Sequence, residues 1–328
     1  MTKIEHDALA ELLKQSRPRP APPAEQTAAA RAELYREWRE LSGRNRLRRR
    51  WQTVAVAATV LVGVFAALLA LRPPTTAVVP VATIDRTFGT VYLLGDDAEL
   101  RATPHLATVF SGQTIVTAKD AGLAVAWGTG GSLRVDGNTR VRFTDESRAY
   151  LENGRVYFDS TPAVAAGNGA HAGPAFMLET PAGAVNHIGT QYMAEIDEER
   201  LVVSVREGEV QIDGSFHDQR LVSGQQATLS GSRRPSILSI SRSGSYWDWV
   251  ARTTPAADVD GWTLYRFLGW AGRELGLDVR FDGEAESIAR SAILRGTINT
   301  QPADALRLRL ATAGLNWHLE EGVLYISD

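Results

Sequence analysis

The sequence predicts a mixed architecture: one membrane-spanning helix, a mainly β domain outside the membrane, and a small α+β module at the C-terminus. Three observations support it: a long uncharged apolar segment, period-two alternation over the middle of the chain, and a return of helical periodicity after it. They divide the chain into an inner arm 1–50, a span 51–71, a linker 72–83, a β-rich domain 84–230, a connector 231–260 and an α+β module 261–328.

The span is the segment WQTVAVAATVLVGVFAALLAL. From Val54 to Leu71 its eighteen residues include no charge, no proline and one glycine. At about 1.5 Å per residue they form roughly 27 Å of helix, close to the ~30 Å hydrocarbon core of a bilayer. The alternative is a buried helix of a soluble protein, but such helices rarely run so long without a polar face. A cleaved signal peptide is not expected, because fifty residues precede the segment.

Positive charges flank this segment on one side. Arg48, Arg49 and Arg50 stand directly before it, whereas Arg72 alone follows, ahead of two prolines. Because positive flanks stay in the cytoplasm, the N-terminus is expected inside and the C-terminal bulk outside. Trp51 stands where an interfacial aromatic anchor belongs. The charge distribution agrees, since residues 1–50 carry a net charge of +5 and the rest of the chain −8.

Small residues recur every four positions within the span, at Ala55, Thr59, Gly63 and Ala67. Such spacing lets two helices approach closely, so weak self-association through the span is an expectation.

The inner arm carries a short apolar stripe. Leu34, Trp38 and Leu41 lie at helical spacings of four and three residues, with Tyr35 beside them. An arm of this length cannot bury a core of its own, so the stripe is a candidate docking site for a cytoplasmic partner. The alternative is a solvated, partly disordered tether.

Residues 84–230 alternate apolar and polar side chains in short runs broken by glycine, asparagine and aspartate. This pattern is typical of strands with one buried face. The segments FGTVYLL, NGRVYFD and EGEVQID also form a faint, irregular repeat. Turn–strand units that stack to bury a shared face favour a β-solenoid or a sandwich.

Six segments of this region together resemble a known family. In order they are GSLRVDGNTRVRF (131–143), YLENGRVYFD (150–159), AFMLETPAGAV (175–185), HIGTQYMAEI (187–196), VVSVREGEVQI (202–212) and RLVSGQQATL (220–229). Their order and spacing resemble the FecR domain of bacterial transmembrane signalling proteins. The resemblance implies a β-rich periplasmic domain in a regulator of the anti-sigma type.

The connector 231–260 is polar and serine-rich and ends in SYWDWV, residues 245–250. Two tryptophans this close together are expected to dock the connector onto a neighbouring domain rather than to bind a ligand.

The sequence pattern of the last module predicts alternating helices and strands. An amphipathic helix from Leu264 to Leu275 ends at Gly276, and a second helix from Pro302 ends at Gly314. Strands are expected at 277–281 and 293–298, and a hairpin at 316–327 turns at Glu321–Gly322. The module resembles the STN domain of secretins and TonB-dependent receptors, mainly through QPADALRLRLATAGLNWHLEEGVLYI.

No catalytic, metal or cofactor site stands out. The six histidines are scattered, none at a metal-ligand spacing, and the chain has no cysteine for thiol or zinc chemistry. The turn at 129–131 lacks the GK[ST] ending of a phosphate loop. We therefore expect no enzyme activity on an external substrate, no cofactor and no nucleic-acid partner.

One bond has reactive potential. The resemblance implies that Gly189–Thr190 matches the bond at which several FecR-type regulators cleave themselves, by an N-to-O acyl shift from the threonine hydroxyl. The structural alternative is that Gly189 bends the backbone and Thr190 begins a strand.

The two resemblances imply a single-pass inner-membrane signalling regulator. Its outer module is expected to meet the signalling domain of a TonB-dependent outer-membrane transporter, with Trp262, Tyr265 and Trp270 as candidate contact residues. Trp317 is a further candidate, but in a hairpin it is expected to serve packing. The inner arm holds or releases a cytoplasmic sigma factor. The alternative is a membrane-anchored periplasmic scaffold that binds no sigma factor. A third hypothesis is an enzyme that acts on envelope polymers.

Overall fold

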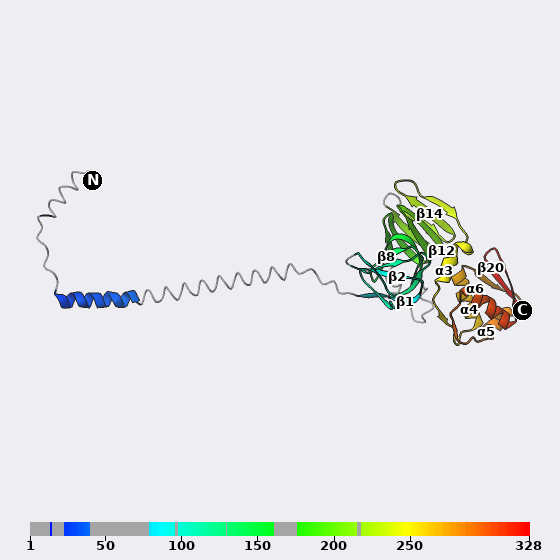
Figure 1. Ribbon diagram of the computed structural model, residues 1–328. Coiled ribbons are helices and arrows are strands. Elements are labelled where there is room, and N and C mark those ends of the chain that lie inside the picture. The colour runs from blue at the N-terminus through cyan, green and yellow to red at the C-terminus, as the bar shows by residue number, and fades with distance from the viewer. Residues whose placement is uncertain are drawn as a thin grey trace. The chain divides into compact units, whose positions relative to one another are not determined.

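The computed structural model describes residues 14, 23–39, 79–95, 98–128, 130–160, 176–214 and 218–328. The chain forms two compact units, Met1–Thr76 and Ala77–Asp328. In the first unit residues 24–39 form a helix, drawn in blue in Figure 1. The expected span 51–71 lies outside the described residues. Among the helices that are described, none is long and apolar enough to cross a membrane.

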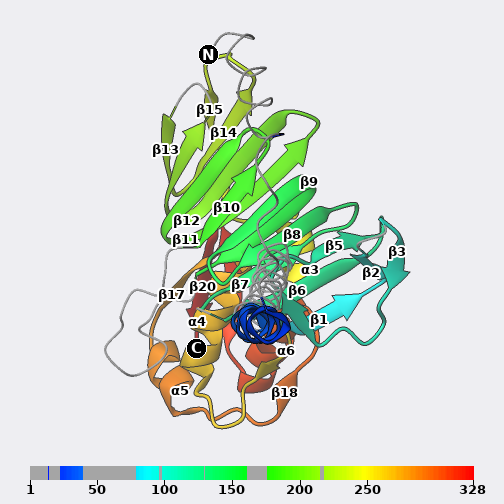
Figure 2. The ribbon, with the colours of Figure 1, turned by 90° about the vertical axis from the view of Figure 1, so that its left-hand side faces the viewer.

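The second unit opens with a sheet of fifteen described strands (Figure 2). They are β1 (Pro80–Phe88), β2 (Val91–Leu94), β3 (Leu100–Ala102), β4 (Thr108–Phe110), β5 (Thr114–Thr117), β6 (Gly122–Trp127), β7 (Ser132–Val135), β8 (Arg140–Asp145), β9 (Arg148–Asp159), β10 (Met177–Thr180), β11 (Gly183–Asp197), β12 (Arg200–Gly214), β13 (Asp218–Val222), β14 (Gln225–Ser230) and β15 (Ser236–Ser239).

The strands pair mostly with antiparallel neighbours. The main path runs β15-β14-β12-β11-β10-β9-β7-β6-β1-β4, and β9 also pairs with β8 and β11. Within the described part of this sheet, β9 and β10 form the one parallel pair. The mainly β prediction is confirmed, with the first strand beginning at Pro80 rather than at residue 84.

The period-two pattern places alternate side chains in one large core. Val141 and Phe143 of β8 and Leu151 of β9 are fully buried there, while Arg142 between the first two is exposed. The Trp127 ring stacks on Phe143 with centroids 5.4 Å apart. Each large apolar side chain buried in this way stabilises the domain by about 1.5–3 kcal/mol, which is why the alternation is a reliable signal.

The segment expected as a connector has structure of its own. Strand β15 extends the large sheet by pairing with β14. A 3₁₀ turn η2 (Ser245–Trp247), a short helix α3 (Asp248–Arg252) and strand β16 (Ala257–Asp258) follow. The segment therefore belongs to both the β domain and the module after it.

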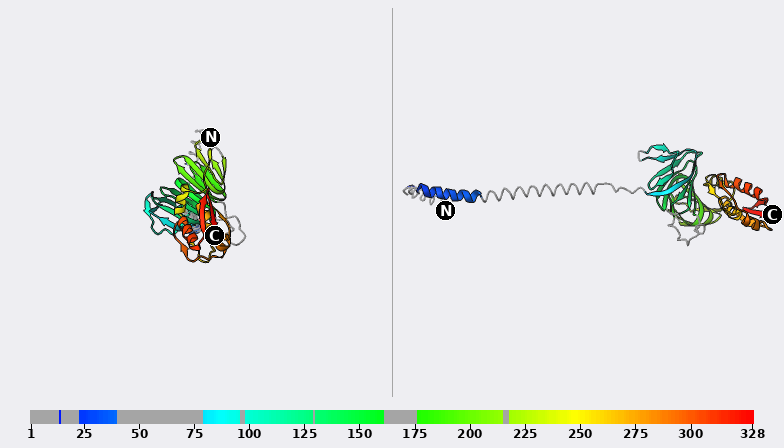
Figure 3. Two further views of the ribbon diagram at one scale, coloured as in Figure 1. Left: turned by 90° about the vertical axis from the view of Figure 1, so that its right-hand side faces the viewer. Right: turned by 90° about the horizontal axis from the view of Figure 1, so that it is seen from below.

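The C-terminal module combines helices α4 (Leu264–Leu275), α5 (Ala285–Ser291) and α6 (Pro302–Ala313) with strands β17 (Asp278–Phe281), β18 (Thr297–Ile298), β19 (Asn316–Glu320) and β20 (Val323–Ser327) (Figure 3). The strands β17, β20 and β19 form a sheet in that order, and β16 pairs with β18.

Local signals placed the ends of the two longer helices correctly. Gly276 and Gly314 both have left-handed backbones at the C-caps of α4 and α6, and Pro302 opens α6. Glu321 and Gly322 also have positive φ angles, as the expected two-residue hairpin turn requires. The expected strand at 293–298 is reduced to β18, and the short helix α5 was not expected.

Candidate functional site

The apolar stripe of the inner arm lies on the described helix of the first unit. Leu34, Tyr35 and Trp38 are exposed to 66%, 66% and 63%, and they border a hollow of about 370 Å³. Large apolar side chains this exposed on a helix are typical of a docking face. Leu41 and the expected membrane anchors Arg48, Arg49, Arg50 and Trp51 lie outside the described residues.

The bond Gly189–Thr190 lies at an irregularity in β11. The pairing of β11 with β12 shifts between Ile188 and Tyr192, and Gly189 has a φ of +61°. Thr190 N–H donates to Ser160 Oγ at 2.6 Å, and Ser160 N–H donates to the Thr190 carbonyl at 3.0 Å. The backbone of Gly208 packs against the Gly189 carbonyl, since a Cβ on Gly208 would lie 2.2 Å from that oxygen.

Three buried polar atoms without a hydrogen-bond partner among the described residues lie along this part of β11. They are His187 Nδ1, Thr190 Oγ1 and Tyr192 Oη. Burial lowers the pKa of His187, which keeps its ring neutral at pH 7, and raises the pKa of Tyr192. A buried hydroxyl without a partner costs free energy, so the Thr190 hydroxyl is retained at a cost to stability.

The predicted contact residues of the last module gather on and beside α4. Trp262 and Trp270 are half-buried against the module's core, and Tyr265 is 36% exposed. The Arg266 guanidinium lies 4.0 Å from the centre of the Trp262 ring, and Arg290 lies 3.8 Å from that of Tyr265. Tyr265 and Trp270 thus lie on α4 and Trp262 just before it, and an arginine lies over Trp262 and another over Tyr265.

The sequence did not reveal the most elaborate polar arrangement of the second unit. We call it the junction: residues 245–254 and the last turn of α4 pack there against β7, β9, β11 and β12. Trp247, Trp249 and Val250 form a buried cluster with Tyr157 and Met193 of the β domain. The prediction that the tryptophan pair docks the connector onto a neighbouring domain is confirmed.

A fully buried ion pair lies at the centre of the junction. Arg134 of β7 and Glu274 of α4 meet at 2.8 Å, with side chains 2% and 9% exposed. Arg134 also donates to the Val250 carbonyl at 2.9 Å, and Thr254 Oγ1 donates to Glu274 at 2.9 Å. Burial alone would raise the pKa of Glu274, but the Arg134 charge and the hydrogen bonds that Glu274 accepts from Arg134 and Thr254 outweigh it and hold that pKa below its usual value.

Two further arginines complete the junction. Arg206 of β12 stacks on Trp247, 4.4 Å from the ring centre, and donates to the Glu274 carbonyl at 3.1 Å. Arg273 of α4 pairs with Asp159 and with Glu207, the latter at 2.7 Å. These charged residues come from strands and a helix far apart in the sequence, so no local sequence pattern predicts that they meet.

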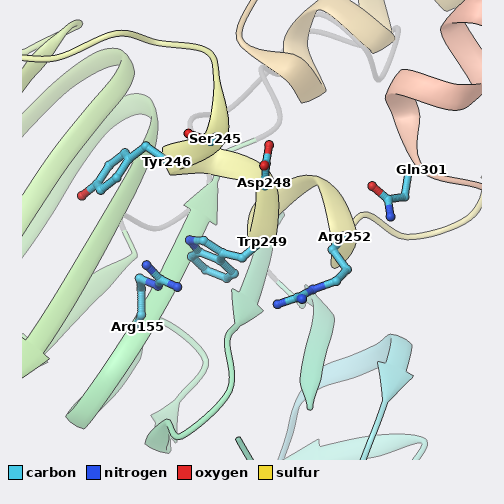
Figure 4. A pocket seen from close by; sticks show the side chains of 7 residues that line it. All are labelled: Arg155, Ser245, Tyr246, Asp248, Trp249, Arg252 and Gln301. Atoms are coloured by element: carbon cyan, nitrogen blue, oxygen red, sulfur yellow. The ribbon is translucent and has the colours of Figure 1, made fainter. Parts of the chain in front are cut away.

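A polar cleft of about 570 Å³ opens beside the junction (Figure 4). It is lined by Arg155, Ser245, Tyr246, Asp248, Trp249, Arg252 and Gln301. Arg155 and Arg252 both pair with Asp136, and Arg155 lies over the ring of Trp249. Across the described ranges, no group of three His, Cys, Asp or Glu side chains is placed to hold a metal ion.

Solved structures with some likeness to the chain include two crystal structures of a candidate anti-sigma factor from Parabacteroides distasonis. Each has 16% identity and a TM-score of 0.34; the first covers 66% of this chain and 98% of that one, the second 65% and 97%. A structure titled "Cell surface anchoring domain" has 22% identity and a TM-score of 0.19, over 20% of this chain and 88% of that chain. No curated protein matches the sequence.

The match to a protein family covers a continuous part of the β domain. It includes β5 to β11 and most of β12, with the irregularity at Gly189–Thr190. Residues 113–211 of this chain match the model of the FecR protein family.

Proposed function

We propose that this chain is a single-pass signalling regulator of the inner membrane, with its N-terminus in the cytoplasm and its second unit in the periplasm. It relays the state of a TonB-dependent outer-membrane transporter to a cytoplasmic sigma factor. The observation that carries the proposal is the FecR family match over residues 113–211. The uncharged segment 51–71 and the arginines before it support the topology.

The inner helix supports the cytoplasmic end of the proposal. Its exposed side chains Leu34, Tyr35 and Trp38 offer an apolar face that a partner's groove can cover. In the proposed mechanism this face binds the sigma factor, and proteolysis at or near the span ends the contact.

The C-terminal module supports the outer end. It is an α+β module, as the sequence pattern predicted, and Trp262, Tyr265 and Trp270 lie on or beside its helix α4. In the proposal this module contacts the signalling domain of the transporter, and the junction transmits that contact to the β domain. The chain acts through binding, without a cofactor and without turnover of an external substrate.

Deletion of residues 1–43 in a host with a reporter that depends on the neighbouring sigma factor tests the proposal. A changed reporter output, at equal amounts of membrane-bound protein, supports a regulator. Unchanged output supports the alternative, a periplasmic scaffold without sigma binding. Protease added to spheroplasts tests the topology, because it must degrade the second unit and spare the inner arm.

A second activity, cleavage of the chain at Gly189–Thr190, is favoured by the buried Thr190 hydroxyl that has no partner among the described residues. In this step Thr190 Oγ attacks the Gly189 carbonyl carbon and the C–N bond breaks. The hydroxyl proton passes to the Thr190 nitrogen, so that the amide becomes an ester and this nitrogen a free amine. Water then hydrolyses the ester to a Gly189 carboxylate and the Thr190 hydroxyl.

A further inference from the structure

The hairpin β19–β20 leaves one strand edge open. In the three-stranded sheet β17-β20-β19, strand β19 lies at the end, and its five residues are all exposed. Among the described residues, only β20 forms a ladder with β19. An open edge is a template for another strand, which natural proteins usually cover or interrupt.

The hydrogen-bond pattern of the hairpin shows which residues of β19 direct their main-chain groups outward. The hairpin has a two-residue turn, so Glu320 and Val323 next to it exchange hydrogen bonds, and the pairs alternate from there. The Ile326 carbonyl accepts a hydrogen bond from the N–H of Asp282, the residue after β17, at 2.9 Å. The main-chain groups of Ile326 therefore point toward β17 and away from β19. Its cross-strand partner Trp317, and likewise Leu319, therefore direct their N–H and C=O groups to the open edge.

The same two residues carry the apolar face of the edge. Trp317 pairs with Ile326 and Leu319 with Leu324, and both residues of β20 are buried in the module's core. Trp317 is nevertheless 40% exposed and Leu319 54% exposed. The core face of the sheet thus continues past the helices that cover it, and ends in two large apolar side chains beside unpaired backbone groups.

We propose that two copies of this chain associate through antiparallel pairing of β19 with β19 of the second copy, about a twofold axis at His318. Trp317 then faces Leu319 of the second copy, and these two residues exchange their outward main-chain hydrogen bonds. Their side chains continue the buried row of Ile326 and Leu324 across the interface. The proposal does not rest on the signalling function, because any chain with this hairpin presents the same edge.

The polar face of β19 is complementary to itself in this register. Asn316 lies opposite Glu320 of the second copy, so the acidic side chains do not face one another. His318 lies on the axis, where its ring already stacks on Tyr325 with centroids 4.8 Å apart. This self-complementarity identifies a second copy, rather than an unrelated strand, as the occupant of the edge.

Single cysteines in the full chain test the register directly, because the natural chain contains no cysteine that could compete. At the axis the two positions 318 form a non-hydrogen-bonded pair about 4.5 Å apart between Cα atoms, a distance that suits a disulfide. His318→Cys is expected to form a covalent dimer under mild oxidation. Glu320→Cys is the matched control, since its two copies lie roughly 14 Å apart along the strands.

Co-expression of differently tagged Asn316→Cys and Glu320→Cys chains is expected to give the mixed dimer in excess over either homodimer. Equal crosslinking at positions 316, 318 and 320, or none at 318, overturns the proposal. If a strand of another protein occupies this edge instead, no crosslink forms at position 318.

Sedimentation of the full chain in detergent gives an independent test. Leu319→Pro removes an outward N–H without removing a hairpin hydrogen bond, and is expected to abolish the dimer while the circular dichroism stays unchanged. Asn316→Lys, opposite Glu320, is expected to tighten the dimer and Asn316→Glu to weaken it, each by roughly two- to tenfold in Kd. A folded Leu319→Pro chain with the mass distribution of the natural chain contradicts the proposal.

Discussion

The guanidinium of Arg134 and the carboxylate of Glu274, 140 residues apart in the chain, lie 2.8 Å apart inside the second unit. One belongs to the β domain and the other to the first helix of the C-terminal module. Because neither side chain is solvated, the pair ties the two modules together in one arrangement. In the proposed function, this connection carries a contact of the C-terminal module to the β domain.

Removal of one partner of this pair is expected to be costly. Glu274→Gln leaves the Arg134 charge buried without compensation, and we expect a loss of about 3–5 kcal/mol in the free energy of unfolding. Arg134→Met combined with Glu274→Met removes both charges and is expected to recover much of that loss. Urea unfolding, followed by the fluorescence of the junction tryptophans, measures both variants. A Glu274→Gln loss below about 1 kcal/mol would mean that the pair is solvated in solution.

The same pair predicts the pH dependence of stability. The pKa of Glu274 is lower in the folded protein than its usual value of 4.5, so the unfolded chain binds the proton first as the pH falls. The contribution of this group is complete above the unfolded pKa and is lost as the pH falls through the folded pKa. We expect the natural chain to lose more stability below about pH 4.5 than the Met/Met variant does. Parallel pH curves for the two proteins would contradict this assignment.

The sequence predicted much of the fold because local signals encode it. Glycines at 276 and 314 mark the ends of α4 and α6, and alternation of side chains marks the strands of the β domain. Helix α5 was missed because its seven residues, AESIARS, are too few and too polar to show a helical period.

The junction was missed for a different reason. The sequence shows Arg134, Arg206 and Glu274 as ordinary charged residues on alternating or helical patterns. Only the packing of strands on the module makes them buried partners. By contrast, the tryptophan pair at 247 and 249 could be interpreted from the sequence, because a large aromatic pair in a polar segment needs a surface to cover it.

Trp247 is expected to contribute strongly to the junction. It is 1% exposed, donates its indole N–H to the Ser241 carbonyl at 2.9 Å, and lies beneath the Arg206 guanidinium. Trp247→Ala should cost about 3–5 kcal/mol in the free energy of unfolding, whereas Trp247→Phe, which keeps most of the buried area, should cost less. Tyr246 is the neighbouring control: it is 38% exposed, and its replacement by phenylalanine should have a smaller effect. Equal losses for the alanine variant and this control would argue against the junction.

Self-cleavage at Gly189–Thr190 predicts a clear difference between two small substitutions. Thr190→Ser keeps a hydroxyl and should still give two fragments, whereas Thr190→Val keeps the shape, removes the nucleophile and should give one full-length band. Denaturing electrophoresis with antibodies to each terminus measures both. A single full-length band for the natural chain would leave Gly189 with its structural role alone, as a bend in β11.

The proposed regulation of a cytoplasmic sigma factor depends on the apolar face of the inner helix. The most direct test is the output of a sigma-dependent reporter with the combined substitution Leu34→Ala and Trp38→Ala in the full chain. Glu37→Ala on the same helix is the matched control. We expect a changed output for the double substitution, an unchanged output for the control, and equal protein levels in both. Unchanged output from the double substitution would contradict the proposed regulation.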